Sequence, residues 1–178
     1  MNLQYLRSIP LATALLAAPV MAHAEADQTI PGFVASCFQY LDKPTELTAR
    51  LDSVAQRLEG RSAENFLKGR KGRAWLLTNE DKLYGFALFD QGICTMTAIS
   101  GDPAAIATDF IDFGKMAEER YKVEWQPVTG ESGWDEHAYT LFDPDNPTDI
   151  YLHMALNNAA HAHIRAIVSV GRIPDNKP

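Results

Sequence analysis

Apolar residues recur at two different periods along the chain, and the change of period separates predicted helices from predicted strands. Between Pro31 and Leu41, and again between Pro44 and Leu58, apolar side chains return every three or four positions, which predicts two helices. Gly60 follows the second pattern and is typical of a residue just past a helix end. A further short helical segment is predicted over residues 62–67.

Beyond Arg73 the period changes to the alternation of half-buried strands. One more helix interrupts this pattern, because Asp102-Pro103 combines an N-cap residue with a proline suited to a first turn, and apolar spacing continues to Ala117. The predicted strands cover residues 74–78, 83–89, 93–99, 121–126, 135–142, 149–156 and 162–172. Short connections favour antiparallel neighbours. The prediction is an α+β fold: an antiparallel sheet with the N-terminal helices and the central helix packed on one face.

Residues 1–24 have the organisation of a secretory signal peptide. Arg7 provides the positive start, residues 11–18 are an apolar run, and Ala22-His23-Ala24 is a small-x-small cleavage site. The apolar run is shorter than the ~20 residues that span a bilayer. We therefore expect cleavage near Ala24, no transmembrane segment, and a single α+β domain over 25–178 in the periplasm or the medium.

Export makes the two cysteines informative. An even number of cysteines in an oxidising compartment favours a disulfide. Cys94 alternates with Met96 and Ala98 at inward positions of a predicted strand, where it could meet Cys37 from the first helix. Two buried free thiols and a redox pair are the alternatives, although the close Cys-x-x-Cys spacing of redox pairs is absent.

Four short segments carry a family resemblance. They are Gly72-Arg73-Ala74-Trp75, Gly85-Phe86-Ala87-Leu88, Gly92-Ile93-Cys94-Thr95 and Asp102-Pro103-Ala104. Over residues 37–113 the chain resembles an uncharacterised family of small exported proteins and lipoproteins of Gram-negative bacteria. The resemblance implies an exported bacterial domain with this cysteine arrangement, and it implies no activity and no catalytic residue. The chain has no lipidation cysteine after its apolar run.

Charge narrows the class of partner. Sixteen basic residues face 23 acidic ones, for a net charge of −7. Proteins that hold a nucleic acid usually show a basic excess, so this charge argues against that class. The one strongly basic run is Lys68-Gly69-Arg70-Lys71-Gly72-Arg73. We interpret it as a solvated connection into a strand; a glycine-rich loop whose N–H groups hold an anion is the alternative.

The last two predicted strands place histidines together on one face of the sheet. The even positions from Ile150 to Leu156 and from Ala162 to Val170 are apolar, so only registers that pair even with even positions bury both sets. Odd positions of both strands then face outward. His137 and Tyr139 of the preceding strand lie on the same face if Ala138 points inward. The predicted face consists of His137, Tyr139, Tyr151, His153, His161, His163 and Arg165. Trp134 is either partly buried or an additional anchor for a partner.

Three functions fit such a face. A zinc site could use His153, His161 and His163 with Asp149 or Glu136; acid–base catalysis could pair a histidine with Asp135 or Asp149; or the face contacts a partner. We prefer the last and expect no cofactor and no catalytic residue. The hypothesis is an exported, non-catalytic envelope protein that binds a protein partner, such as an immunity protein or inhibitor against a periplasmic toxin or hydrolase. A metal-assisted hydrolase and a structural envelope component are the alternatives.

Overall fold

The computed structural model describes residues 27–80, 82–128 and 133–173, and the predicted signal peptide lies outside the described residues. The helical elements are α1 (Thr29–Phe33), the π-helical turn η1 (Val34–Phe38), α2 (Pro44–Val54), α3 (Gly60–Leu67) and α4 (Pro103–Ala117). The strands are β1 (Gln56–Leu58), β2 (Gly72–Asn79), β3 (Lys82–Phe89), β4 (Cys94–Ala98), β5 (Lys122–Gln126), β6 (Trp134–Phe142), β7 (Asp149–Asn157) and β8 (Ala166–Ile173).

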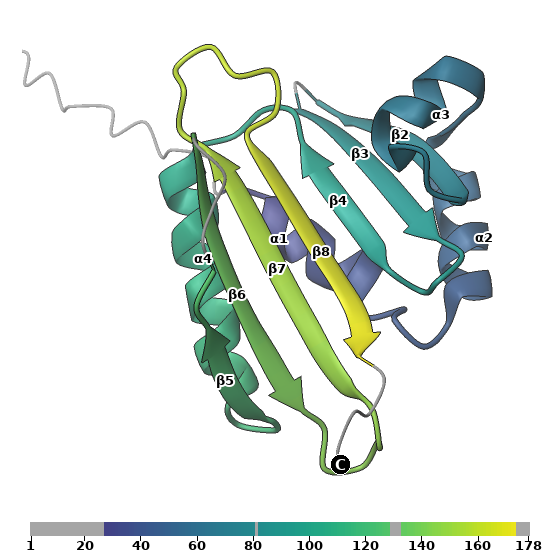
Figure 1. Ribbon diagram of the computed structural model, residues 1–178. Helices are drawn as coiled ribbons and strands as arrows, with labels where there is room; N and C mark the ends of the chain where they lie inside the picture. The colour runs from purple at the N-terminus through teal and green to yellow at the C-terminus, as the bar shows by residue number, and fades with distance from the viewer. Residues whose placement is uncertain (1–26, 81, 129–132, 174–178) are drawn as a thin grey trace, which may run out of the picture.

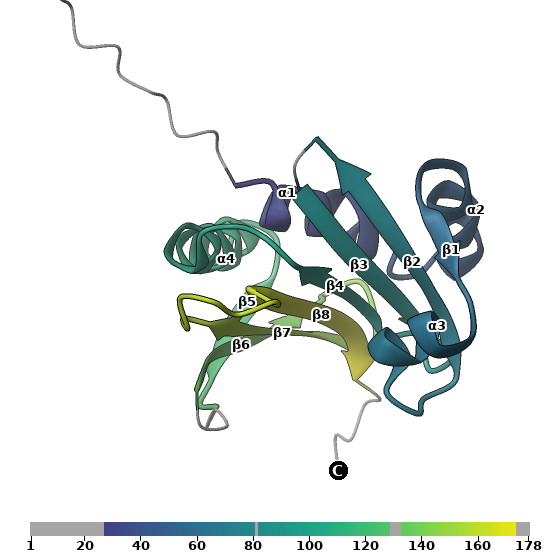
Figure 2. The same ribbon diagram turned by 90° about the horizontal axis from the view of Figure 1, so that it is seen from above.

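All eight strands form one sheet in the order β1-β2-β3-β4-β8-β7-β6-β5; Figure 1 shows β2 to β8, and Figure 2 shows β1 beside β2. Every neighbouring pair is antiparallel, so the predicted α+β class with an antiparallel sheet is confirmed. We call the face that carries Met96 and Met154 the inner face, and the face that carries Thr95 and His153 the outer face. Helices α1, η1, α2 and α4 cover the inner face (Figures 1 and 2). Among the described residues, no helix is both long enough and apolar enough to cross a membrane.

The sheet is built from two consecutive units of the same design. In each unit a helix is followed by four strands that pair in chain order: α2 precedes β1 to β4, and α4 precedes β5 to β8. The last strands of the two units, β4 and β8, pair antiparallel at the centre of the sheet. The strand order is therefore mirrored about a β4–β8 seam, and α3 is an insertion between the first two strands of the first unit.

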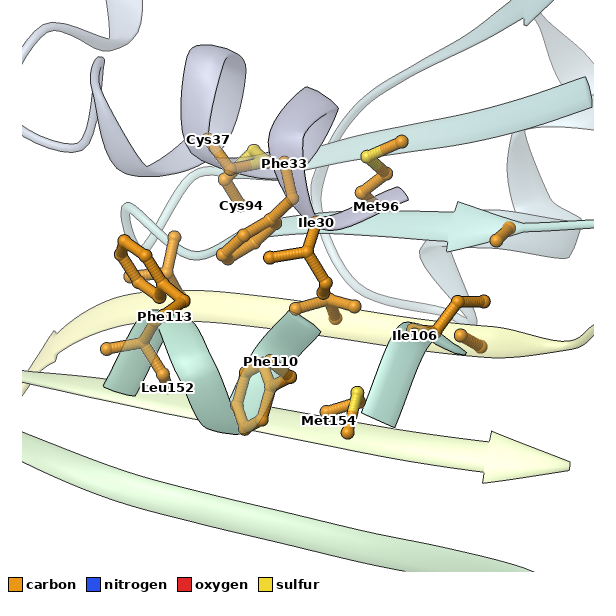
Figure 3. Close-up of a cluster of buried hydrophobic side chains, with 14 of the residues drawn as sticks. Ile30, Phe33, Cys37, Cys94, Met96, Ile106, Phe110, Phe113, Leu152 and Met154 are labelled. Carbon is orange, nitrogen blue, oxygen red and sulfur yellow. A yellow bond between two sulfur atoms is a disulfide. The ribbon is translucent and has the colours of Figure 1, made fainter. Parts of the chain in front are cut away.

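The main core lies between the inner face and its helices. Ile30 and Phe33 of α1 and Phe110 of α4 pack against β-strand side chains such as Leu152 and Met154, all of them at most 3% exposed (Figure 3). The predicted disulfide is confirmed: Cys37 of η1 is bonded to Cys94 of β4 across a Cα–Cα distance of 5.4 Å. This bond fixes the N-terminal helical segment to the centre of the sheet.

Helix α3 covers the outer face at the β1–β3 end. Leu67 packs with Ala74, Ala87 and Phe89 in a second apolar cluster. The ring of Phe66 lies directly on Gly85, where an added Cβ would come within 2.0 Å of the ring. A glycine at this position of β3 therefore allows the helix to approach the sheet closely.

Three predicted boundaries are wrong. Helix α2 ends at Val54, because Ala55 has the extended backbone angles φ −129° and ψ 153° and leads into β1. Gly60, which we predicted to follow a helix end, instead begins α3 with φ +53°. The last strand begins at Ala166 and not at residue 162, because the Arg165 side chain donates to the carbonyl oxygens of Ala159 and Ala160 at 2.7 and 3.0 Å and holds a loop there.

Candidate functional site

The predicted register of the last two strands is confirmed. Leu152 pairs with Val170 and Met154 with Val168, so even positions meet even positions and all four residues are buried on the inner face. His153 lies opposite Ser169 on the outer face. Two strands that each bury one face allow only registers that pair even with even positions, because a shift by one residue would expose one apolar set.

Strand β6 has the orientation opposite to the one we predicted. Ala138 pairs with His153 and therefore faces outward, which turns its neighbours His137 and Tyr139 to the inner face. Tyr139 is fully buried, with its ring 4.9 Å from that of Phe110 and 4.8 Å from that of Trp125, measured between centroids. The placement of His137 and Tyr139 on the outer face was wrong, because the large Tyr139 ring fills the space beneath α4 that Ala138 could not fill.

The loop before β8 separates the remaining histidines from His153. His161 and His163 are exposed in that loop, whereas Ser169, the pairing partner of His153, is three residues inside β8, about 10 Å along a strand. Arg165 holds the same loop through its two carbonyl contacts. Within 27–80, 82–128 and 133–173, no group of three His, Cys, Asp or Glu side chains is arranged to hold a metal ion.

Trp134 is half-buried at the first position of β6. It pairs with Asn157, the last residue of β7. It therefore lies on the outer face, four residues along β7 from His153. Trp134 is therefore partly buried, one of the two predicted alternatives, at the end of the sheet nearest the loop that carries His161.

Of the predicted residues, His153 and Tyr151 are brought together. The Nε2 of His153 lies 3.0 Å from Oε2 of Glu136, and the two side chains are only 27% and 17% exposed. The Tyr151 ring is stacked beside the imidazole at a centroid distance of 6.5 Å and an angle of 13°. Burial raises the pKa of the Tyr151 hydroxyl, and the nearby Glu136 carboxylate raises it further, so Tyr151 is a neutral hydrogen-bonding group at physiological pH.

A cavity of about 370 Å³ opens beside this pair on the outer face. We call it the His153 pocket; it is lined by Arg70, Ile93, Thr95, Tyr151, His153, Ser169, Val170, Gly171, Arg172 and Ile173. The hollow exists because α3 covers only the β1–β3 end of this face and because Gly171 has no side chain. A Cβ at Gly171 would approach Cγ1 of Ile93 to 3.0 Å.

The pocket combines hydroxyl groups, two guanidinium groups and apolar walls. The hydroxyl oxygens of Thr95 and Ser169 lie 3.0 Å apart. The Arg70 guanidinium stands 3.7 Å from the centroid of the Phe89 ring and is exposed, whereas Arg172 is already bound by Asp42 and by the Thr148 carbonyl oxygen. Such a set can hold a ligand by hydrogen bonds, by charge and by apolar contact.

Of the residues that line the pocket, sequence reasoning named only Tyr151 and His153 as candidates, and it missed Arg70, Thr95 and Ser169 among others. Arg70 belongs to the basic run, which is exposed from Lys68 to Lys71 as predicted for a solvated connection, and only Arg70 of that run lines the pocket. Thr95 and Ser169 stand at outward positions of predicted strands, so their shared face could be predicted, but their adjacency depends on the β4–β8 pairing.

Comparison with known proteins does not assign the chain to a family. No family model, no curated protein and no solved structure matches it.

Proposed function

We propose that the protein is an exported, non-catalytic binding protein of the bacterial envelope, and that its partner contacts the outer sheet face at the His153 pocket. The observation that carries this proposal is the pocket itself, in which Tyr151, His153 and Ser169 from adjacent strands stand beside apolar walls on a face that α3 leaves uncovered. Side chains held on paired strands keep their positions, and such preorganisation favours binding.

The proposed location rests on two features. The sequence of residues 1–24 is typical of a signal peptide, and the Cys37–Cys94 bond is of the kind that persists in oxidising compartments. The resemblance of residues 37–113 to exported proteins of Gram-negative bacteria belongs to the same proposal. Detection of the protein in the periplasmic fraction with a mature N-terminus near Glu25 is the expected result. Protein with an uncut N-terminus in the cytoplasmic fraction would contradict the proposed location in the envelope.

The partner that we propose is a protein, with immunity against, or inhibition of, a periplasmic toxin or hydrolase as the specific form. The net charge of −7 favours a basic protein over a nucleic acid, because complementary charge accelerates the encounter of two proteins. The Arg70 guanidinium and the aromatic Tyr151 are residue types enriched at the centres of protein interfaces.

The experiment is affinity capture from an envelope extract, with identification of the captured protein by mass spectrometry. Tyr151→Ala and Arg70→Ala should each reduce capture at least tenfold. Arg57→Ala is the matched control, since Arg57 is a half-exposed arginine on β1 at the edge of the sheet. Absence of any captured protein across growth conditions, or capture that the two pocket variants leave unchanged, would refute the proposal.

If the captured protein is a hydrolase or a toxin, its activity is measured with and without an equimolar amount of this chain. Inhibition that Tyr151→Ala abolishes supports the immunity or inhibitor form. Unchanged activity in the complex restricts the proposal to binding alone.

A further inference from the structure

A second surface, on the opposite side of the sheet, has a different chemistry. An apolar groove of about 870 Å³ runs between the α1–η1 segment and α4. Ile30, Val34 and Phe38 form one wall, and Phe113 and Met116 form the other. Met116 is 60% exposed, the highest value for a large apolar side chain among the described residues. Methionine adapts its shape to different apolar partners and is frequent on protein-binding surfaces.

The charged side chains that line this groove are all carboxylates. They belong to Asp27, Asp109 and Asp112. Burial raises the pKa of Asp109, and the neighbouring carboxylates of Asp27 and Asp112 raise it further. Lys115 lies 2.9 Å from Asp112, but both side chains are more than 60% exposed, and exposed pairs of this kind are weak. The rim of the groove therefore favours positive charge.

The walls of the groove are held in place. The Cys37–Cys94 bond anchors η1 to β4, and the Phe38 ring meets the Phe113 ring edge-on at a centroid distance of 5.1 Å across the floor. The η1 segment is a π-helical turn. This geometry is rare in proteins overall, but where it occurs it is often at a functional site. A preformed groove loses little conformational entropy when it binds a partner.

We propose that this acidic apolar groove binds one amphipathic α-helix of a protein partner, with leucine-type side chains on its apolar face and Lys or Arg on its flanks. Helices bind apolar grooves through residues at spacings of three, four and seven. The α4 wall from Asp109 to Met116 is about 10 Å long, which corresponds to two turns of a bound helix. The inference is independent of the His153 pocket, because the groove lies on the helix side of the sheet.

Charge distinguishes this occupant from two others. An anionic membrane surface would be repelled by Asp27, Asp109 and Asp112. A second copy of the chain that used the same surface would place these carboxylates opposite their own counterparts, since a two-fold interface is self-complementary. A helix with basic flanks avoids both conflicts.

The test uses fluorescent 16-residue helical peptides and the purified full chain. Two peptides share one leucine face and differ only in their flanks, which carry lysine in one and glutamate in the other. Fluorescence anisotropy should show binding of the lysine peptide, with an affinity at least tenfold higher than that of the glutamate peptide and a decrease in affinity as salt increases. Asp112→Asn should reduce the affinity for the lysine peptide several-fold.

Met116→Lys should reduce the affinity for the lysine peptide at least tenfold. Val54→Lys is the matched control, because Val54 is 57% exposed on α2, outside the groove. Urea unfolding verifies that both variants fold. Failure of the lysine peptide to bind, or equal affinities for the two peptides or for wild type and Met116→Lys, would overturn the proposal. So would a dimer in sedimentation velocity that Met116→Lys dissociates, because a second copy would then occupy the groove.

Discussion

Reduction of the Cys37–Cys94 bond should destabilise the protein by an amount that follows from chain length. In the chain-entropy model, a cross-link across a sequence separation of 57 residues stabilises the folded state by about 4 kcal/mol at 25 °C. This free energy corresponds to roughly a thousandfold change in the folding equilibrium constant. With a urea m-value of about 2 kcal/mol/M, the reduced protein should unfold at a urea concentration roughly 2 M lower than the oxidised protein.

The assay is urea unfolding monitored by tryptophan fluorescence, with and without reductant. Reduced wild type is the better comparison for the oxidised protein, because it keeps both buried sulfur atoms and creates no cavity. A Cys37→Ala/Cys94→Ala variant is the control, since its unfolding must not respond to reductant. Coincident unfolding curves of oxidised and reduced wild type, or alkylation of both thiols in the folded protein without reductant, would refute the reasoning.

Three smaller perturbations test other parts of the fold. Tyr139→Phe should raise the free energy of unfolding by about 1 kcal/mol, because the buried Tyr139 hydroxyl has no hydrogen-bond partner within the described part of the chain; a loss measured by urea unfolding would contradict this. Gly85→Ala should cost about 1–3 kcal/mol through its clash with Phe66, and a double-mutant cycle with Phe66→Ala should show coupling, whereas additive effects would argue against the contact. The Arg172 side chain donates to Asp42 and lowers the pKa of that carboxyl. The pair therefore stabilises the folded protein at pH values above the ordinary aspartate pKa, and this stabilisation is lost as the pH falls through the lowered pKa of Asp42. The difference in free energy of unfolding between wild type and Asp42→Asn should therefore decrease as the pH falls. A constant difference from pH 7 to pH 2 would contradict the stabilising role of the Arg172–Asp42 pair.

The sequence predicts those parts of the fold in which only one orientation of a strand buries its apolar side chains. Strand β7 alternates strictly, with every even position from Ile150 to Leu156 apolar, so its orientation and its pairing with β8 could be predicted. The same argument placed Cys94 on the inner face, where it meets Cys37. A strict period is informative because a one-residue shift reverses every side chain.

The errors fall where the period is ambiguous. In β6, four successive residues from Ala138 to Leu141 are buried, so alternation does not indicate which face is inner, and only the size of Tyr139 against the small Ala138 decides it. The start of β8 depends on Arg165, whose contacts with Ala159 and Ala160 form within a loop and leave no periodic pattern. The His153–Glu136 contact joins residues 17 positions apart and follows only from the correct β6 orientation.

The two proposed surfaces lie on opposite sides of the sheet, and the β4–β8 pairing shows how the chemistry of the two sides differs. At the seam the even positions of β4 meet the even positions of β8, as in the pair Met96 and Val168, so the inner side is apolar and can be covered by α1 and η1. The outer side at the same pairs carries Thr95 and Ser169, whose hydroxyls bond to each other. Because Cys94 precedes Thr95 on β4, the disulfide anchors the wall of the groove to the strand that lines the pocket. The wall of the groove depends on that bond, whereas the pocket residues of β4, β7 and β8 are held by the strand pairing itself.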